Sequence, residues 1–172
     1  TDIDGNVYET VQIGEQVWMA ENLKVTQYDN GDTIPYIVLD EDWNGMSSAG
    51  YCYNQLLNNQ QLYGNIYNWY AVNGDEDKAL CMEGWRVPSI NDWNNLFDYL
   101  GGSSVAGGKM KECTEGNCPE SEYWNSPNTG ATNESEFRAL PGGWRAGNHG
   151  GFDNITGRNT YYWSSDLSGE PH

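Results

Sequence analysis

Apolar and polar residues alternate near the start of the chain, and this pattern predicts a β-hairpin. Val7, Val11, Ile13 and Val17 are separated by polar residues, with Gly14-Glu15 between the two runs. A two-residue connection containing glycine is typical of tight hairpins, and alternation with period two places one face of each strand on a core. We therefore expect two antiparallel strands joined at Gly14-Glu15.

Two later segments show helical spacing instead. Residues 62–72 are predicted to form a helix, because Tyr63, Ile66, Tyr67 and Tyr70 fall on one helical face, and over residues 90–100 the pattern is longer and clearer. Ser89 stands at the N-cap position of the second helix, Asp92 three residues on resembles a capping box, and Gly101 is placed to end it. The predicted apolar face of this helix is Ile90, Trp93, Leu96, Phe97 and Leu100.

The remaining pattern is irregular. Short strands are expected at residues 50–54, 84–88 and 159–166, residues 101–108 read as a flexible glycine-rich connection, and the acidic loop around Trp43 is expected to expose that side chain. No repeat or linker divides the chain. The predicted fold class is α+β, as a single domain over residues 1–172 with two helices, short antiparallel strands and long loops.

Composition narrows the possible partners. The chain has 8 Trp and 12 Tyr but 3 Phe, a mean hydropathy of -0.76, and 25 acidic against 8 basic side chains. A net charge of -17 excludes nucleic acid, which needs a basic surface, and disfavours anionic membranes. Neutral polysaccharides, cations such as calcium and protein partners remain, although the charge also serves solubility alone. No apolar run reaches membrane-spanning length.

Catalytic motifs are missing from the sequence. Its two histidines are His149 and His172, and a thiol–imidazole pair of Cys81 with His149 has no local support. Four cysteines in an acidic, aromatic chain favour an oxidising, extracytoplasmic setting, and their spacing does not suit a zinc site. Carboxylate pairs for glycoside hydrolysis cannot be told from chance among 25 acids. We therefore predict a protein that is not an enzyme.

Two acidic turns are candidates for calcium. Asn73, Asp75 and Asp77 alternate along one of them, and Asp2, Asp4 and Asn6 alternate along the other. Oxygen ligands at alternate positions around a glycine suit a hard cation, but neither turn has the distal glutamate of a complete calcium loop. The competing interpretation is a solvated acidic turn.

A glycine-rich loop near residue 150 is the candidate site for carbohydrate. Aromatic faces beside amide, carboxylate and guanidinium groups are what a sugar needs. The candidate ligand-binding residues are Trp144, Arg145, Asn148, His149, Asp153 and Asn154. The alternative is that Trp144 fills the core and Arg145 has a structural partner.

Five ordered blocks resemble one known family, the Fibrobacter succinogenes major paralogous domain. They are "DIDGNVYETVQIGEQVWMAENLK" (2–24), "YGNIYNWYAV" (63–72), "GWRVPSINDWNNLFDYLGG" (84–102), "TNESEFRALPGG" (132–143) and "YYWSS" (161–165). The resemblance implies a secreted or cell-surface bacterial protein with a C-type lectin-like fold, related to that of the formylglycine-generating enzymes. It also implies adhesion or polysaccharide binding. The activity of those enzymes is not implied, because it needs a cysteine pair near the C-terminus and no cysteine follows Cys118.

The resemblance bears on the disulfides. In lectin-like folds a cysteine ahead of the second helix pairs with one in a closing strand, and Cys81 stands at the first of these positions. This chain ends before such a strand, which is expected to leave an open sheet edge. Cys113 and Cys118 are close enough for a local disulfide. Cys52 then pairs with Cys81, unless Cys81 pairs beyond residue 172.

The leading functional hypothesis is a non-enzymatic, extracellular module for adhesion or carbohydrate binding, with a polysaccharide or cell-surface glycan as partner. The alternative is a structural subunit of a homo-oligomer or filament, suggested by the expected open edge. Three positions are candidates for glycosylation: Asn133 and Asn154 stand in Asn-x-Ser/Thr patterns, and Thr33 in "DTI" resembles a bacterial O-glycosylation pattern.

Overall fold

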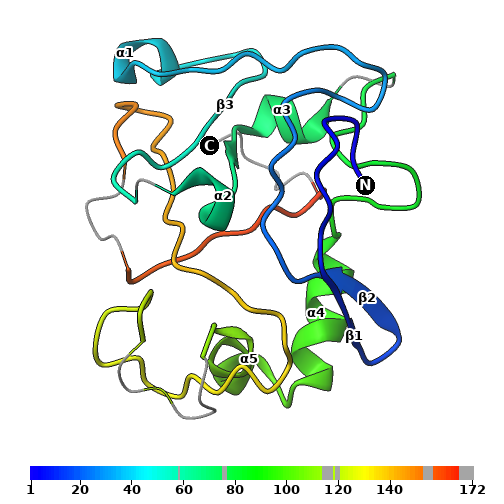
Figure 1. The fold of residues 1–172 in the computed structure, drawn as a ribbon, viewed down its shortest axis with the longest axis vertical. Coiled ribbons are helices and arrows are strands. Elements are labelled where there is room, and N and C mark those ends of the chain that lie inside the picture. Colours follow the sequence, from blue (N-terminus) through cyan, green and yellow to red (C-terminus); the bar gives the residue numbers. More distant parts are fainter. Residues whose placement is uncertain (58, 75–76, 114–117, 119–120, 153–156, 167–172) are drawn as a thin grey trace.

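The computed structural model describes residues 1–57, 59–74, 77–113, 118, 121–152 and 157–166. They form a mixed α+β arrangement with much irregular backbone (Figure 1). The elements in chain order are β1 (Thr10–Ile13), β2 (Gln16–Met19), α1 (Asp40–Trp43), β3 (Tyr51–Cys52), α2 (Gln60–Tyr63), β4 (Ile66–Tyr67), α3 (Trp69–Asn73), α4 (Ile90–Tyr99) and α5 (Ser103–Met110). β1 pairs with β2 and β3 with β4, both antiparallel.

The N-terminal hairpin is confirmed. Gly14 adopts a φ of 62°, the left-handed conformation that a two-residue turn requires, and Ile13 pairs with Gln16 across it. Ile13 and Trp18 are buried, whereas Val17 faces outward. The hairpin lies beside α4 (Figure 1), so its buried face covers that helix.

The best-predicted helix is also confirmed. α4 starts with a complete capping box, in which the Ser89 hydroxyl accepts from the Asp92 amide and the Asp92 carboxylate accepts from the Ser89 amide. Trp93 and Leu96 face the core, and Gly101 follows the last turn with a φ of 99°. Ile90, expected on the apolar face, is half exposed because the first turn projects beyond the core.

The prediction of one continuous helix over residues 62–72 is wrong. Gly64 adopts a φ of 70° and ends α2, and a side chain there would lie 2.8 Å from the Leu23 carbonyl oxygen. The chain then extends as β4, and α3 begins afresh because the Asn68 side chain caps it. The tyrosines are spaced as they would be in one helix, but they belong to three elements, α2, β4 and α3.

Three further expectations are corrected. The sequence predicts residues 101–108 to be flexible, but Ser103–Met110 form α5 because Ala106 and Met110 are buried against α4 and the surrounding core. The predicted strands at 84–88 and 159–166 do not form among the described residues, apart from one parallel bridge between Gly143 and Thr160. Trp43 is buried rather than exposed, because it packs against the Arg145 guanidinium.

The core consists of two main clusters. One joins β1, β2, α4 and α5, and its members are Ile13, Trp18, Trp93, Leu96, Leu100, Ala106, Met110, Phe137 and Ala139. The other lies around β4 and α3, and its members are Val25, Tyr28, Ile34, Tyr67, Ala71 and Leu80. Among the helices formed by the described residues, none has the length and apolar character needed to cross a bilayer.

The cysteines follow the prediction only in part. Cys113 and Cys118 form the expected local disulfide, with Cα atoms 5.6 Å apart. The pairing of Cys52 with Cys81 does not form, and both thiols are free. Cys52 is buried in β3 beside the Arg145 guanidinium. Cys81 is partly buried and follows the buried Leu80.

Candidate functional site

A wide, open cleft of about 1540 Å³ lies between the two core clusters. Its walls come from β2, the loop after α1, β4 with α3, residues 80–88, residues 142–148 and residues 160–163. Seven of the eight tryptophans line it, all except Trp124. In this cleft, described segments from across the chain present aromatic side chains to a common space.

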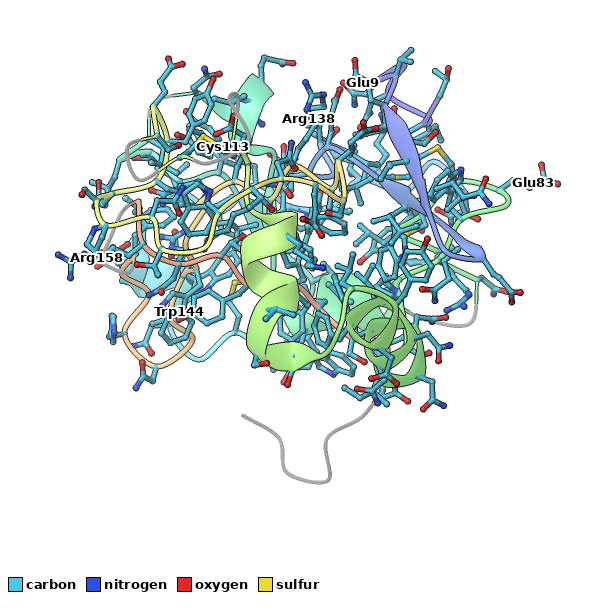
Figure 2. The ribbon with its side chains drawn as sticks, turned by 90° about the horizontal axis from the view of Figure 1, so that it is seen from below. Glu9, Glu83, Cys113, Arg138, Trp144 and Arg158 are labelled. Atoms are coloured by element: carbon cyan, nitrogen blue, oxygen red, sulfur yellow. A yellow bond between two sulfur atoms is a disulfide. The ribbon has the colours of Figure 1, made fainter. Side chains whose placement is uncertain are left out.

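The first exposed aromatic pair of the cleft is Trp144 with Tyr161. The parallel bridge between Gly143 and Thr160 sets the next two residues side by side, and their ring centroids are 5.8 Å apart. Trp144 is 43% and Tyr161 58% exposed. Trp144 lies on the side of the molecule away from the β1–β2 hairpin (Figure 2). The pair therefore offers two accessible ring faces.

The second aromatic pair is Trp163 with Trp69 of α3, whose ring centroids are 5.7 Å apart. The Trp163 indole donates to the Tyr67 carbonyl at 2.9 Å, which fixes the ring orientation. Trp163 remains 43% exposed. Tyr162, between the two pairs in sequence, contacts Trp93 and Phe137 of the core, lines the cleft as well and is 38% exposed.

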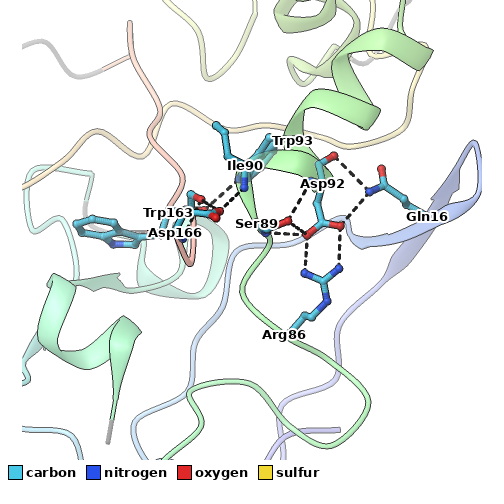
Figure 3. A network of polar contacts seen from close by, with 9 residues as sticks. Gln16, Arg86, Ser89, Ile90, Asp92, Trp93, Trp163 and Asp166 are labelled. Carbon is cyan, nitrogen blue, oxygen red and sulfur yellow. Dashed lines mark hydrogen bonds and ion pairs between the residues drawn. The ribbon is translucent and has the colours of Figure 1, made fainter. Parts of the chain in front are cut away.

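A polar network holds residues 163–166 against the start of α4 (Figure 3). The Trp93 indole donates to the Trp163 carbonyl at 3.1 Å, and the Ile90 amide donates to the Asp166 carboxylate at 2.5 Å. The hydrogen bonds from the Ile90 amide and from the Ser164 hydroxyl lower the pKa of the Asp166 carboxyl. A carboxylate at a helix N-terminus is favourable because the free amides and the helix dipole are positive there.

The other half of this network fixes the N-cap of α4. Both guanidinium nitrogens of Arg86 donate to the two Asp92 carboxylate oxygens, and Gln16 of β2 approaches the same group. The Arg86 and Ser89 bonds hold the pKa of Asp92 well below its usual range. The network thus ties β2, α4 and residues 163–166 together along the cleft.

Arg145 has the protein partners that the structural alternative for this residue expects. Its side chain is fully buried and donates to the carbonyls of Gly150, Ile37 and Val38 at 2.6–3.0 Å, and to the Asp40 carboxylate at 3.0 Å. Its guanidinium also lies 4.9 Å from the Trp43 ring centroid and 5.0 Å from that of Phe152. Every accessible direction is occupied, so Arg145 positions the loop that carries Trp144.

Uncharged polar side chains also line the cleft. The Gly45 amide donates to the Gly147 carbonyl at 2.8 Å, which joins the loop after α1 to the glycine-rich loop. Three residues at this junction line the cleft and are exposed: Asn44, Ser47 and Asn148. Their side chains make no hydrogen bond within the described residues, so they are available to a ligand.

The comparison with known proteins fits this region. The family model of the Fibrobacter succinogenes major domain matches residues 11–172, which includes every wall of the cleft. The chain belongs to this family. No curated protein and no solved structure matches it.

In this Fibrobacter succinogenes major domain, the predicted carbohydrate residues separate. Trp144 and Asn148 lie on the cleft, whereas His149 is exposed outside its lining and accepts the Gly151 amide on Nδ1. Asp153 and Asn154 lie outside the described residues. Sequence reasoning missed Asn44, Ser47 and Tyr161. The "NG" turn after Trp43 was the available signal for the first two, because it places polar side chains at a loop tip.

The two acidic turns are the calcium candidates. Among the described residues no group of three or more His, Cys, Asp or Glu side chains could hold an ion. Asn73 and Asp77 are exposed, and Asp75 lies outside the described residues. In the N-terminal turn the Asp2 carboxylate accepts from Asn6 and Tyr8, and Asp4 accepts from Thr26. Protein donors thus occupy both of these carboxylates.

The other candidate positions are placed as follows. Thr33 is exposed in a loop, as an acceptor of a glycan would need to be. Asn133 has a φ of 49° and its side-chain oxygen accepts the Arg138 amide at 3.0 Å, so its side chain already has a structural partner. Cys81 lines the cleft, but burial raises the pKa of its thiol to about 11, so it is protonated at neutral pH.

Proposed function

We propose that this domain is a non-enzymatic carbohydrate-binding module of a secreted or cell-surface bacterial protein, and that it acts in adhesion. The observation that carries the proposal is the exposed Trp144–Tyr161 pair on an aromatic cleft that Asn44 and Asn148 also line. A C-type lectin-like fold, which the family resemblance implies, belongs to the same proposal. The Cys113–Cys118 disulfide is compatible with an oxidising extracellular setting.

The chemistry of the cleft favours a neutral sugar. Indole and phenol rings present flat, apolar faces with a polar edge, which suits the C–H face of a pyranose ring. Asn44, Ser47 and Asn148 add amide and hydroxyl groups that both donate and accept hydrogen bonds. A net charge of -17 disfavours anionic glycans through long-range repulsion.

Binding to neutral polysaccharides tests this function directly. The intact domain is titrated calorimetrically with soluble neutral polysaccharides and mixed with insoluble cellulose, with and without calcium. We expect Trp144→Ala to lower the affinity by about tenfold or more, because an exposed aromatic at the centre of a site dominates binding energy. Circular dichroism should show an unchanged fold, since Trp144 is partly exposed.

Tyr99→Ala is the matched control. Tyr99 is an exposed aromatic at the end of α4, outside the cleft lining. Its replacement should leave binding unchanged. Lack of binding to every neutral glycan, under both calcium conditions, overturns the proposed function. Equal losses in Trp144→Ala and Tyr99→Ala would show that the effect is not specific to the cleft.

A second candidate function, a structural subunit of a surface assembly, is favoured by the outer edge of β2. Because Ile13 and Gln16 flank a two-residue turn, they form a hydrogen-bonded pair, and so do Val11 and Trp18. The backbone N–H and C=O groups of Val17 and Met19 therefore point away from β1. No other described strand pairs with this edge, and such an edge is a template for an added strand.

Light scattering over a concentration series separates the two candidates. A subunit should self-associate, and Val17→Lys should suppress association by placing a charge on the edge. Val7→Lys is the control, because Val7 is exposed but lies outside both strands. A protein that stays monomeric at the highest concentrations reached would contradict the assembly role and leave the carbohydrate proposal unaffected.

A further inference from the structure

We infer that the two aromatic pairs are two subsites for one sugar chain, so that the cleft takes a linear neutral oligo- or polysaccharide along residues 160–163, not a single terminal sugar. The inference rests on the proposed function and adds to it the length and linearity of the ligand. The observation behind it is that one short segment, residues 161–163, contributes a ring to each pair.

Tyr162 lies between the two pairs in sequence, is 38% exposed and lines the cleft with them. Its ring packs against Trp93 and Phe137, with ring centroids 5.5 and 5.6 Å away. Tyr161 and Trp163, on either side of it, are 58% and 43% exposed and also line the cleft. One short segment therefore presents aromatic side chains to the cleft, and two of them belong to the pairs.

Tyr161 and Trp163 each contact a second ring from another part of the chain. Trp144 joins Tyr161, and Trp69 joins Trp163, with nearly equal centroid separations of 5.8 and 5.7 Å. All four side chains line the same cleft. The two pairs therefore form two similar aromatic surfaces in one cleft. Such an arrangement suits a ligand made of repeated sugar units.

The second subsite is held in place before any ligand arrives. The Trp163 indole is bonded to the Tyr67 carbonyl and its own carbonyl to the Trp93 indole. The Ser165 amide donates to the Pro88 carbonyl at 2.9 Å, and Asp166 caps α4 (Figure 3). A preorganised surface binds without an additional ordering cost, which is the arrangement a binding site needs.

The dimensions and the chemistry of the cleft suit a chain of several sugars. Its volume of about 1540 Å³ exceeds the roughly 300–1,000 Å³ of pockets for single small ligands. Uncharged hydrogen-bonding groups line the cleft together with both pairs, among them Asn148 and the exposed Tyr70. A single sugar would leave one of the two pairs in contact with water.

A length series of oligosaccharides tests the inference. The neutral polysaccharide that binds the wild-type domain best is cut into oligomers from one to six sugars, and each is titrated into wild type, Trp144→Ala and Trp69→Ala. In wild type we expect the affinity to rise by about a hundredfold once the oligomer is long enough to reach both pairs, because the second contact is intramolecular. Each variant should lose this rise while keeping the affinity for the shortest oligomers that use the remaining pair.

Three outcomes overturn the inference. Wild-type affinity that does not change from the shortest to the longest oligomer shows a single-sugar site and leaves the proposed function intact. Trp69→Ala that binds the longest oligomer as wild type does, while Trp144→Ala does not, shows that the second pair is no subsite. If no polysaccharide binds wild type, the proposed function and this inference fail together. Tyr99→Ala, outside the cleft, should reproduce the wild-type length dependence.

Discussion

Arg145 holds the glycine-rich loop of the site in position through its protein contacts. Its buried guanidinium joins residues 37–40 to the loop that contains Gly150, and packs between two aromatic rings. A buried cation is costly unless each of its donors is satisfied, and here three carbonyls and one carboxylate do so. The planar fork of arginine fits this set of acceptors, and a lysine ammonium does not.

Arg145→Lys should therefore lower the free energy of unfolding by about 2–4 kcal/mol, because several buried carbonyls lose their donors. Urea denaturation followed by tryptophan fluorescence measures this change. Arg158→Lys is the control, since Arg158 is exposed, and should change the stability by less than about 0.5 kcal/mol. Similar losses in the two variants would show that the fork of Arg145 has no special role.

The two free cysteines should be unreactive in the folded protein. Burial raises the pKa of both thiols to about 11, and for Cys52 the nearby Arg145 offsets only part of this effect. Because the thiolate is the nucleophile, alkylation by iodoacetamide near pH 8 should be slow in native protein and fast in urea, with mass spectrometry as the measurement. Rapid native alkylation of Cys81, which lines the cleft, would instead show an activated thiol.

At the scale of elements, α4 is the part that local chemistry specifies. Its cap, its apolar face and its glycine stop all lie within 13 consecutive residues, Ser89–Gly101, so the sequence pattern is sufficient to predict it. α2, β4 and α3 show the opposite case. Their tyrosine spacing predicts one helix, but Gly64 and the Asn68 cap divide the segment because it must pass close to Leu23 and pair with β3.

Removing the N-cap of α4 should cost stability. Ser89→Ala should lower the free energy of unfolding by about 1 kcal/mol, because the Asp92 amide loses its acceptor. Ser104→Ala in α5 is the matched control: Ser104 is exposed, and its side chain makes no hydrogen bond within the described residues. An equal effect of the two substitutions on urea midpoints would contradict the importance of the cap.

The same cap gives a pH dependence whose sign is fixed by Asp92. The folded state lowers the pKa of Asp92, chiefly through Arg86 and then Ser89, so its stabilisation is present above the ordinary aspartate pKa of about 3.9. It is lost as the pH falls through the lower folded value. Asp92→Asn should thus be less stable than wild type near pH 7, and the difference should shrink below about pH 4. A difference independent of pH would contradict this assignment.

For the whole molecule, charge is the dominant long-range term. With 25 acidic and 8 basic side chains, most carboxylates have no cationic partner, and self-repulsion opposes the compact state. Six ion pairs join described residues, and five of them are partly exposed on both sides. Such pairs contribute little each, so screening should relieve more repulsion than it removes attraction.

The melting temperature should therefore rise between about 0.01 M and about 0.15 M sodium chloride, over which the screening length falls from about 30 Å to about 8 Å. Differential scanning fluorimetry measures it, with the same series in a nonionic osmolyte at matched osmolality as the control. A melting temperature that falls with salt would show that the ion pairs outweigh the net repulsion.

The sequence by itself determined the features that depend on neighbours a few residues apart. These are the hairpin turn at Gly14, the capping box of α4 and the Cys113–Cys118 disulfide, together with the acidic charge and the family. In the hairpin turn, the capping box and the disulfide, the interacting groups lie within a few residues of one another, so the local sequence is sufficient to predict the contact.

Only the tertiary structure decided where the aromatic side chains meet. It placed Trp144 on a surface and buried Arg145 beneath it, and it gave the glycine-rich segment 103–110 a helical form through contacts with a distant core. It also brought Trp69 to Trp163 and Asn44 to Asn148. These pairs are separated by roughly a hundred residues, and their meeting depends on burial and backbone hydrogen bonds summed over the whole chain.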